Sequence, residues 1–386
     1  MAEVSVIIPA YNAQDYIDEC LNSVRSQTFT DIEILVVDDG STDDTLSCVR
    51  RHVEEDGRIR IFSQANQFAG VARNKGMSEA TGEFFYFLDA DDWIEPDALQ
   101  VMMQSAAEFA CDIVIARSEG FDNQTGDTWI LNNALNGLPY DSVLKSSDYA
   151  DRLFQCFVGW PWDKLFRADF VRREGLEFQP LRTTNDAYFV FCALALASSV
   201  TCCDKVLFHH RSNNARSLEG SRVKSWHCAL DAMVSIDESF KGLELYPALR
   251  QSFCNWVMNY SYWTVSTLPS QAGEAYLIDL QSLVSSMSLD SEYYPCISER
   301  LFRENVAKTR PQLLMSVVSL QEALFESERL FDELSAASDQ QKNEVADLRD
   351  ALAKSERKVE EIYQSRSYRL GNFFMKPLRF IKDHVG

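Results

Sequence analysis

The chain has 386 residues, of which 46% are hydrophobic and 12% aromatic, enough for roughly two domains with sizeable cores. Its 58 acidic residues exceed its 37 basic residues by 21. The resulting net charge of −21 excludes a general nucleic-acid binder, because phosphate contacts require a surplus of Lys and Arg. The abundance of aromatic residues also excludes intrinsic disorder of the whole chain.

Sequence patterns exclude further classes. No segment reaches the ~18 to 20 apolar residues of a membrane span, and the N-terminus lacks the basic and apolar parts of a signal peptide. The ten cysteines show no Cys-x-x-Cys spacing, which disfavours a zinc site or a disulfide framework. The sequence therefore predicts a cytoplasmic protein with reduced thiols.

The first 100 residues alternate short β-branched runs with helical patterns. Strands are expected at 4–8, 34–37, 58–62 and 84–88, and helices at 42–51 and 69–80. The first strand is expected to stop at Pro9, and the first helix to use Asn12 as its N-cap. The residues that this helix is expected to bury are Ile17, Cys20, Leu21 and Val24. Repeated βα units of this length predict parallel strands with helices on both faces.

The pattern beyond residue 100 is less regular. A strand is expected at 113–116, a helix at 187–197, and a further strand that ends at His210. Residues 221–312 are expected to be mainly helical.

A heptad repeat covers residues 317–362. Ten of its fourteen a and d positions are apolar, and charged residues fill much of the remainder. A helix of this length would extend ~69 Å at ~1.5 Å per residue, too long to pack along a small globular body. We therefore expect a coiled coil over 313–365, and with it a homodimer. An amphipathic helix lying on its own domain is the open alternative.

The last segment reverses the sign of the charge. Between residues 366 and 386, five basic residues stand against Asp383, a net of +5 − 1 = +4, and aromatic and aliphatic side chains are interleaved with them. A peripheral contact with the anionic inner face of the cell membrane is one interpretation, each basic residue contributing ~1 kcal/mol. A segment that packs on a partner protein is the other.

Two acidic clusters follow expected strands. Asp38 and Asp39 follow the second strand, and the segment 89–92 follows the fourth. Ligands of doubly wound sheets bind beyond the carboxyl ends of the strands. Adjacent carboxylates are costly unless a cation or hydrogen-bond donors compensate them, and their oxygens suit Mg²⁺ or Mn²⁺. Solvated turns use the same residues, so this spacing alone is a weak signal.

The order of four motifs makes the signal specific. They are VSVIIPAYN at 4–12, VDDGSTD at 37–43, ARNKG at 72–76 and FLDADD at 87–92. Together they resemble the family 2 glycosyltransferases, nucleotide-sugar-dependent enzymes with a GT-A-type fold. The resemblance is dense over residues 1–100 and looser over 160–220. It implies an α/β fold with a Rossmann-like mixed sheet flanked by helices, followed here by the helical region and the coiled coil.

The resemblance assigns a nucleoside pocket to the first two motifs. Pro9, Ala10 and Tyr11 would line it, with Tyr11 against the base. Asp39 would accept a hydrogen bond from a uracil ring, which favours a UDP-sugar as donor. Plain packing is the open alternative for Tyr11.

The third and fourth motifs would hold the rest of the donor. Arg73 would lie beside the nucleotide, and Asp89 near the ribose and the donor sugar. Asp91, together with Asp89, would bind the Mn²⁺ or Mg²⁺ ion that bridges the diphosphate. A helix-surface ion pair is the open alternative for Arg73.

The family places a Glu-Asp pair at the start of a helix in its second half. The corresponding residues here are Asn185, where Glu is usual, and Asp186. Asp186 is then the expected general base, which takes the proton of an acceptor hydroxyl. An Asp at this position can equally be a helix N-cap.

Two further segments resemble family motifs near the acceptor and the diphosphate. Trp162 would stack on an acceptor sugar, although a buried core Trp is the alternative. Arg211 would neutralise the leaving phosphate. His209 or His210 could be a third metal ligand, a core histidine being the alternative.

The resemblance implies a single in-line displacement with inversion, from a nucleotide-sugar to a hydroxyl of a surface glycan or lipid-linked oligosaccharide. The expected organisation is a glycosyltransferase domain at 1–220, divided at residue 100 into donor and acceptor halves, a helical extension at 221–312, the coiled coil and the tail 366–386. An inactive glycosyltransferase-like scaffold of a membrane complex is the alternative. A processive synthase is disfavoured, because the chain lacks a Gln-x-x-Arg-Trp motif.

Overall fold

The computed structural model describes residues 2–131, 135–212, 223–285 and 350–358, and nine single residues between 311 and 329. The chain divides into two compact units, Met1–Trp256 and Val257–Gly386. Helix α9 (Tyr246–Thr267) crosses the division. None of the helices in the described ranges combines the length and apolar character that a membrane span needs.

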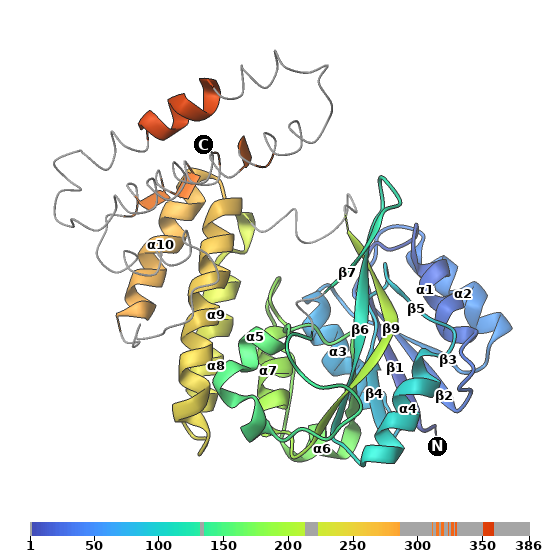
Figure 1. The fold of residues 1–386 in the computed structure, drawn as a ribbon. Coiled ribbons are helices and arrows are strands. Elements are labelled where there is room, and N and C mark those ends of the chain that lie inside the picture. The colour runs from blue at the N-terminus through green and yellow to red at the C-terminus, as the bar shows by residue number, and fades with distance from the viewer. Residues whose placement is uncertain are drawn as a thin grey trace, which may run out of the picture. The chain divides into compact units, whose positions relative to one another are not determined.

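The first unit is built on one mixed sheet (Figure 1). The strands in its described residues are β1 (Val4–Ala10), β2 (Ile32–Asp38), β3 (Ile59–Ser63), β4 (Phe84–Phe87), β5 (Trp93–Ile94), β6 (Ile113–Asp122), β7 (Thr128–Ile130), β8 (Lys164–Arg167) and β9 (Val200–Ser212). Their order is β3-β2-β1-β4-β8-β6-β9-β5, with β7 paired to β6. The first four are parallel to one another, as expected, whereas β8 runs antiparallel to β4 and β6. The predicted mixed sheet is confirmed.

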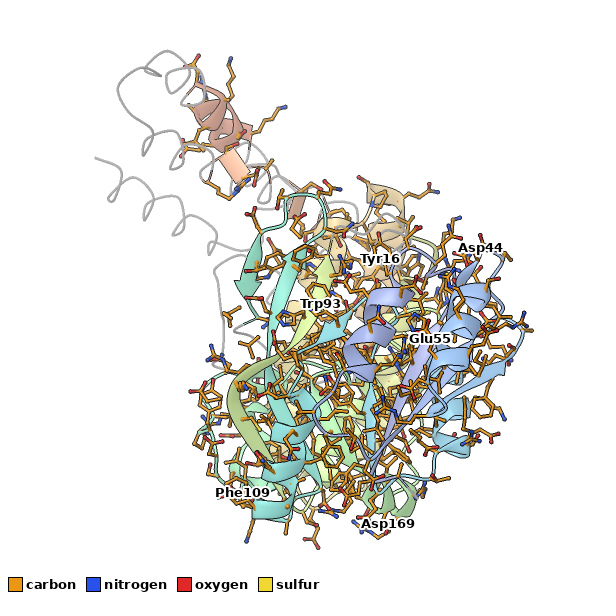
Figure 2. The ribbon with its side chains drawn as sticks, turned by 90° about the vertical axis from the view of Figure 1, so that its right-hand side faces the viewer. Tyr16, Asp44, Glu55, Trp93, Phe109 and Asp169 are labelled. Atoms are coloured by element: carbon orange, nitrogen blue, oxygen red, sulfur yellow. The ribbon has the colours of Figure 1, made fainter. Side chains whose placement is uncertain are left out.

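Helices cover both faces of this sheet. The helices of the first unit are α1 (Ile17–Arg25), α2 (Thr45–Glu55), α3 (Phe68–Glu79), α4 (Ala98–Phe109), α5 (Leu153–Cys156), α6 (Ala168–Arg173), α7 (Ala187–Leu196) and α8 (His227–Phe240). Of these, α5 and α8 pack against α7. In Figure 2, Tyr16 marks the start of α1 and Glu55 the end of α2.

Strand β1 supplies residues to the cores on both sides, because successive side chains of a strand point to opposite faces. Val6 and Ile8 join the cluster that contains the apolar face of α1. Ile7 faces α3, where a Cβ on Gly76 would lie 2.4 Å from its side chain. The absence of a side chain at Gly76 therefore lets α3 lie directly on β1.

The expected boundaries of the first strand and helix were wrong. β1 continues through Pro9 to Ala10, because β4 pairs only with Val4–Ile7 and leaves no ladder bond for the missing N–H of Pro9. Asn12 has a φ of 50° and is not an N-cap; its Oδ1 accepts a hydrogen bond from the backbone N–H of Thr42 at 2.8 Å. Helix α1 begins at Ile17 and buries the four residues expected of it.

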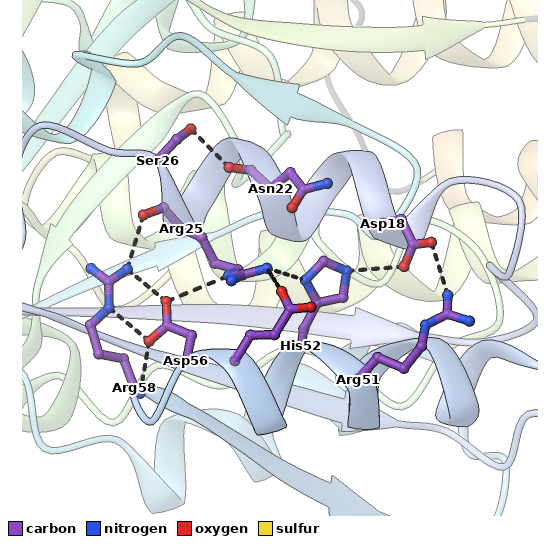
Figure 3. A network of polar contacts seen from close by, with 9 residues as sticks. Asp18, Asn22, Arg25, Ser26, Arg51, His52, Asp56 and Arg58 are labelled. Carbon is purple, nitrogen blue, oxygen red and sulfur yellow. Dashed lines mark hydrogen bonds and ion pairs between the residues drawn. The ribbon is translucent and has the colours of Figure 1, made fainter.

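A polar network joins α1 to α2 on the surface (Figure 3). Arg25 Nη1 donates to Nδ1 of the buried His52 at 2.8 Å, and Nε2 of His52 lies 3.0 Å from Asp18 Oδ1. Because a guanidinium can only donate, His52 accepts at Nδ1 and donates from Nε2. The ring therefore orients two charged side chains from α1 and fixes how α2 lies against it.

Replacing His52 by Ala is expected to lower the free energy of unfolding by about 1–3 kcal/mol, because both partners lose a hydrogen bond in a half-buried site. Urea unfolding measures the loss. Arg51→Ala, which removes an exposed ion pair to the same Asp18, is the control and should cost below about 1 kcal/mol. Equal losses for the two variants would contradict the ordering role of His52.

The helical expectation for 221–312 is confirmed where the structure describes it, by α8, α9 and α10 (Ser270–Val284). In the second unit, the hydroxyl groups of Ser261 and Tyr276 lie 2.8 Å apart and join α9 to α10. Residues 350–358 are helical. Most of the heptad segment 313–365, and all of the tail 366–386, lie outside the described residues, so the coiled coil and the membrane contact stay predictions.

Nine of the ten cysteines fall in the described residues, and all nine are buried thiols. Burial raises the pKa of Cys111 and Cys156 to about 11 and that of Cys192 to about 12. None of these nine cysteines forms a disulfide in the described ranges.

Candidate functional site

The motif residues gather at the carboxyl edge of the parallel strands. Ala10 ends β1 beside Asp38 at the end of β2, and Asp89 follows β4, the other neighbour of β1. The Asp39 N–H donates to Ala10 O at 2.8 Å, which brings the first two motifs into contact. Parallel topology thus places residues that are far apart in the sequence on one edge, where sheets of this kind bind ligands.

Asp39 is a buried carboxylate whose backbone N–H binds Ala10, the residue before the exposed Tyr11. Its Oδ1 accepts hydrogen bonds from Gln64 Nε2 at 2.8 Å and from the Gln67 backbone N–H at 2.9 Å. Tyr11 is 48% exposed, whereas Pro9 and Ala10 are buried. Plain packing, the alternative for Tyr11, does not describe this ring. A fixed carboxylate beside an open aromatic face can hold a flat ring that carries an N–H donor.

Arg73 connects two carboxylate-bearing segments. Its Nη2 lies 2.5 Å from Asp89 Oδ1, and its Nη1 donates to Asn185 Oδ1 at 2.9 Å. The guanidinium is buried and lies 5.2 Å from the centre of the Phe178 ring. Arg73 is therefore a buried bridge between the donor motif and the segment of the expected base, and the helix-surface alternative is wrong.

Helix α3 holds the segment that leads to Asp186. Asn74 exchanges two hydrogen bonds with the backbone of Phe178, from Nδ2 to the carbonyl and from the N–H to Oδ1, both 2.8 Å long. A Cβ on Gly70 would lie 2.2 Å from Gln179 O, so the loop and the helix touch at this point. Thr184 has a φ of 58°, a strained conformation for a β-branched residue. Contacts on both sides thus hold a strained turn immediately before Asp186.

Asp186 occupies the N-cap position of α7, as the alternative interpretation required. Its carboxylate, however, makes none of the capping hydrogen bonds to the described first turn. Burial raises the pKa of Asp186, and the Arg73 guanidinium opposes that rise. A carboxylate with a raised pKa at a helix start, close to a donor motif, suits proton transfer.

The fourth motif is tied to β9 by Arg211 and His210. The Asp92 carboxylate accepts a hydrogen bond from the Arg211 N–H at 2.8 Å and lies 3.2 Å from His210 Nδ1. Burial disfavours the charged imidazole, but Asp92, with Asp91 and Asp89, raises the pKa of His210 to about 9. The contacts of Asp92 with His210 and Arg211 therefore hold the acidic turn against β9.

The Arg211 guanidinium is buried among protein groups. It donates to Asp91 O at 2.9 Å and Asn123 Oδ1 at 2.8 Å, pairs with Glu19, and lies 4.8 Å from the centre of the Trp93 ring. Figure 2 labels Trp93 and, nearby, Tyr16, whose ring centre is 5.1 Å from the same guanidinium. Arg211 thus fixes the backbone of the acidic turn 89–92, and its direct contact with a diphosphate stays a prediction.

The donor set at 89–91 fits a hard divalent ion in part. Asp89 and Asp91 are half-exposed on one turn, closed by a hydrogen bond from the Asp92 N–H to Asp89 O at 3.1 Å. In the described residues, no group of three or more His, Cys, Asp or Glu side chains is placed to hold one ion. His209 pairs with Glu95 and Glu119, and His210 with Asp92. Two carboxylates, completed by diphosphate oxygens, suit Mg²⁺ or Mn²⁺.

Trp162 is a core residue, which was the alternative interpretation. It is 3% exposed, and its ring stacks on Phe208 at 3.9 Å and on Trp160 at 4.6 Å between centroids. Neighbouring rings cover its faces, so it is not placed to stack on an acceptor sugar in this structure. Its half-exposed neighbour Trp160 is nearer to solvent.

The sequence did not indicate several residues that shape this site. Asn74 and Gly70 fix the base segment to α3, Asn123 receives Arg211, and the Asp92–His210 pair holds the acidic turn. The ARNKG motif contains Asn74, and only the tertiary contact with Phe178 gives it a role. Asn185 was noted as a departure from the family pattern, and its place as acceptor of Arg73 gives that departure a function.

Known proteins are similar to this chain in sequence and in fold. Residues 5–173 match the model of glycosyl transferase family 2. EpsH of Bacillus subtilis (strain 168), named as a glycosyltransferase, is 32% identical over 266 residues, which cover 65% of this chain and 76% of EpsH. The chondroitin synthase of Escherichia coli is 42% identical over 164 residues, 42% of this chain and 23% of that protein.

A solved structure supports the fold independently. Residues 1–349 of S. aureus TarS in complex with UDP-GlcNAc align with a TM-score of 0.65 over 86% of this chain and 92% of that one, at 19% identity. The family model covers the strands and turns that carry Asp39, Asp89 and Asp91, and the match to EpsH extends over most of that relative. The chain therefore belongs to glycosyl transferase family 2 and is a glycosyltransferase.

Proposed function

We propose that the chain transfers a hexose from a UDP-sugar to a hydroxyl of a glycan acceptor, with inversion at the anomeric carbon. The observation that supports it most is the buried bridge from Asp89 through Arg73 to Asn185, next to Asp186. It connects the expected donor site with a carboxylate of raised pKa. The presence of Asp89, Asp91 and Asp186 around one site favours an enzyme over an inactive scaffold.

Asp39 supports uridine as the base. Its carboxylate is fixed by hydrogen bonds from Gln64 and Gln67, and Tyr11, which follows its partner Ala10, is exposed. This carboxylate would accept a hydrogen bond from the N3–H of uracil. TarS, which shares the fold, is known in complex with UDP-GlcNAc. We infer that the same nucleotide lies across the ends of β1 and β2 in this chain.

The chemical step proposed for Asp186 is proton removal. Asp186 takes the proton of the acceptor hydroxyl as that oxygen forms a bond to the anomeric carbon, and the bond from that carbon to the UDP oxygen breaks. Asp89 and Asp91 would hold a Mg²⁺ or Mn²⁺ ion, which when bound would neutralise charge on the departing diphosphate. Arg73 keeps Asp89 and the base segment in fixed relative positions, so that positioning contributes to the rate.

For the acceptor we propose a growing surface glycan or lipid-linked oligosaccharide, reached from the cytoplasmic side. The similarity to chondroitin synthase, named for a glycan product, supports a sugar acceptor. The charge and aromatic pattern of 366–386 supports a peripheral contact with the membrane. A homodimer through 313–365 would place two such tails side by side.

The proposal predicts micromolar, metal-dependent binding of UDP. Isothermal titration with and without Mn²⁺ should show this binding in the wild type and its loss in Asp91→Ala, because a carboxylate of the metal site is removed. Asp169→Ala, which changes an exposed carboxylate on α6, is the matched control and should bind as the wild type does. Binding of GDP or dTDP but not UDP would overturn the assignment of Asp39. Binding of no nucleotide would overturn the donor site.

A further inference from the structure

The structure points to an aromatic platform for the acceptor on the hairpin β6–β7. In the sheet, Gly120 of β6 lies between Trp129 of β7 and His210 of β9. Residues directly opposite one another in neighbouring strands point to the same face. Trp129, Gly120 and His210 therefore share one face of the sheet.

The neighbouring register positions confirm which face this is. Glu119 pairs in register with His209, and the two side chains lie 3.2 Å apart. Phe121 pairs with Arg211, whose guanidinium lies 5.3 Å from the ring centre. These residues occupy the face that holds Arg211, so Trp129 and His210 occupy the opposite face.

That opposite face leads to the candidate active site. His210 is hydrogen-bonded to Asp92 of the acidic turn and stacks on Trp162 at 5.4 Å and near Trp160 at 6.2 Å between centroids. From β7 to β9 the distance is two strand spacings, ~10 Å. Trp129 thus lies on the same face as His210, two strands away from it across Gly120, and a short oligosaccharide is long enough to span that distance.

The Trp129 indole lies over Gly120, the residue opposite it in β6. A Cβ on Gly120 would lie 2.4 Å from the indole, so the ring rests on the strand backbone where a side chain is missing. The residue is nevertheless 42% exposed. The indole thus packs against the strand at Gly120 in a residue that is still exposed, an arrangement that favours stacking against the apolar C–H face of a pyranose.

We propose that Trp129, seated on Gly120, binds a sugar ring of the acceptor glycan away from the reacting hydroxyl. The proposal rests on the proposed function, because it requires a glycan acceptor at the acidic turn. It gives the chain a specificity residue for acceptors longer than one sugar. It also assigns to Trp129 the stacking on a sugar that Trp162 cannot provide, because Trp162 is buried.

The test measures glycan binding at Trp129 itself. The full chain is labelled with 5-fluorotryptophan, the Trp129 resonance is assigned with Trp129→Phe, and chitohexaose, cellohexaose and a chondroitin hexasaccharide are titrated with UDP and Mn²⁺ present. At least one hexasaccharide is expected to shift the Trp129 resonance. Trp129→Ala should weaken that glycan about 10-fold or more, a loss of about 1.4 kcal/mol, and Trp129→Phe should retain most of the affinity.

Two further variants separate a binding role from a structural one. Gly120→Ala keeps the indole but places a methyl group where the indole now lies. It should weaken binding of the same hexasaccharide as Trp129→Ala does. Trp263→Ala, which removes a similarly exposed Trp of the second unit, should leave glycan affinity unchanged. UDP affinity, measured in each sample, reports whether the fold is intact.

The outcomes distinguish the two proposals. Normal UDP binding without any shift of Trp129, or with glycan affinity that Trp129→Ala leaves unchanged, overturns the platform and leaves the proposed function standing. Absence of UDP binding in the wild type overturns the proposed function first. A shift at Trp129, together with a selective loss of glycan affinity in both Trp129→Ala and Gly120→Ala, supports the platform.

Discussion

Replacing Asp186 by Asn is expected to lower kcat by about 10²–10⁴-fold, the range that a general base contributes, while UDP affinity stays near that of the wild type. Asn keeps the size and the helix-start position of Asp but cannot accept a proton. Transfer assays and UDP titration on the same preparation measure the two quantities. Asp169→Asn, on an exposed turn of α6, is the matched control.

The pH dependence gives a second view of the same residue. Burial raises the pKa of Asp186 in the folded protein, with Arg73 opposing. The base acts when it is ionised, so kcat/KM should fall as the pH is lowered through a pKa above the usual carboxyl range. Asp186→Asn should remove this acidic limb. A variant that retained both the rate and the limb would show that another group takes the proton.

Replacing Lys164 by Met is expected to destabilise the first unit by about 3–5 kcal/mol, the typical cost of leaving one partner of a buried ion pair alone. Lys164 and Asp163 are both 0% exposed, with Nζ 2.6 Å from Oδ1. The same ammonium donates to Val158 O at 3.1 Å and Trp160 O at 2.8 Å. Its removal therefore leaves the Asp163 carboxylate and two backbone carbonyls in the core without this hydrogen-bond donor.

Denaturant unfolding of Lys164→Met and of the double variant Asp163→Leu/Lys164→Met tests this reasoning. The double variant should recover a large part of the loss, because no isolated charge remains. Lys75→Met, which breaks an exposed pair with Glu79, should have a much smaller effect. If the double variant were as unstable as the single one, packing rather than the stranded charge of Asp163 would explain the loss.

The parts of the site that were predicted lie at the ends of regular elements. A buried strand followed by acidic residues leaves little choice of location, because the ends of parallel strands meet at one edge. Asp39 and Asp89 were therefore placed correctly relative to β2 and β4. The apolar face of α1 was also predicted, since helical spacing fixes which side chains share a face.

The parts that were not predicted depend on contacts between segments far apart in the chain. Asn74 binds the backbone of Phe178 across 104 positions, and Arg211 binds Asn123 across 88. Neither pairing leaves a local pattern, since each residue is an ordinary polar one in its own segment. Asn12 shows the same effect over 30 positions: a cap was expected, but its side chain accepts a hydrogen bond from the backbone of Thr42.

Trp162 shows that a motif can indicate an aromatic side chain without indicating whether that side chain is exposed. The sequence placed an aromatic cluster beside the acceptor region, and such a cluster is present. Which ring is covered depends on β9, whose Phe208 stacks on Trp162 and leaves Trp160 nearer to solvent. Nothing in the sequence indicates that Gly120 contacts Trp129, because the contact depends on the register of β6 and β7.

The buried thiols give this chain a built-in reporter of local opening. Alkylating reagents attack thiolates, and burial keeps Cys111, Cys156 and Cys192 largely protonated as well as inaccessible at neutral pH. Labelling of each cysteine must then follow transient unfolding of its own segment. Cys20, whose Sγ lies 3.5 Å from Asp89 O, reports on the acidic turn, and Cys192 on the helix that begins after Asp186. Mass spectrometry after timed alkylation, with and without nucleotide, would therefore show separately how much the nucleotide slows the opening of the acidic turn and of helix α7.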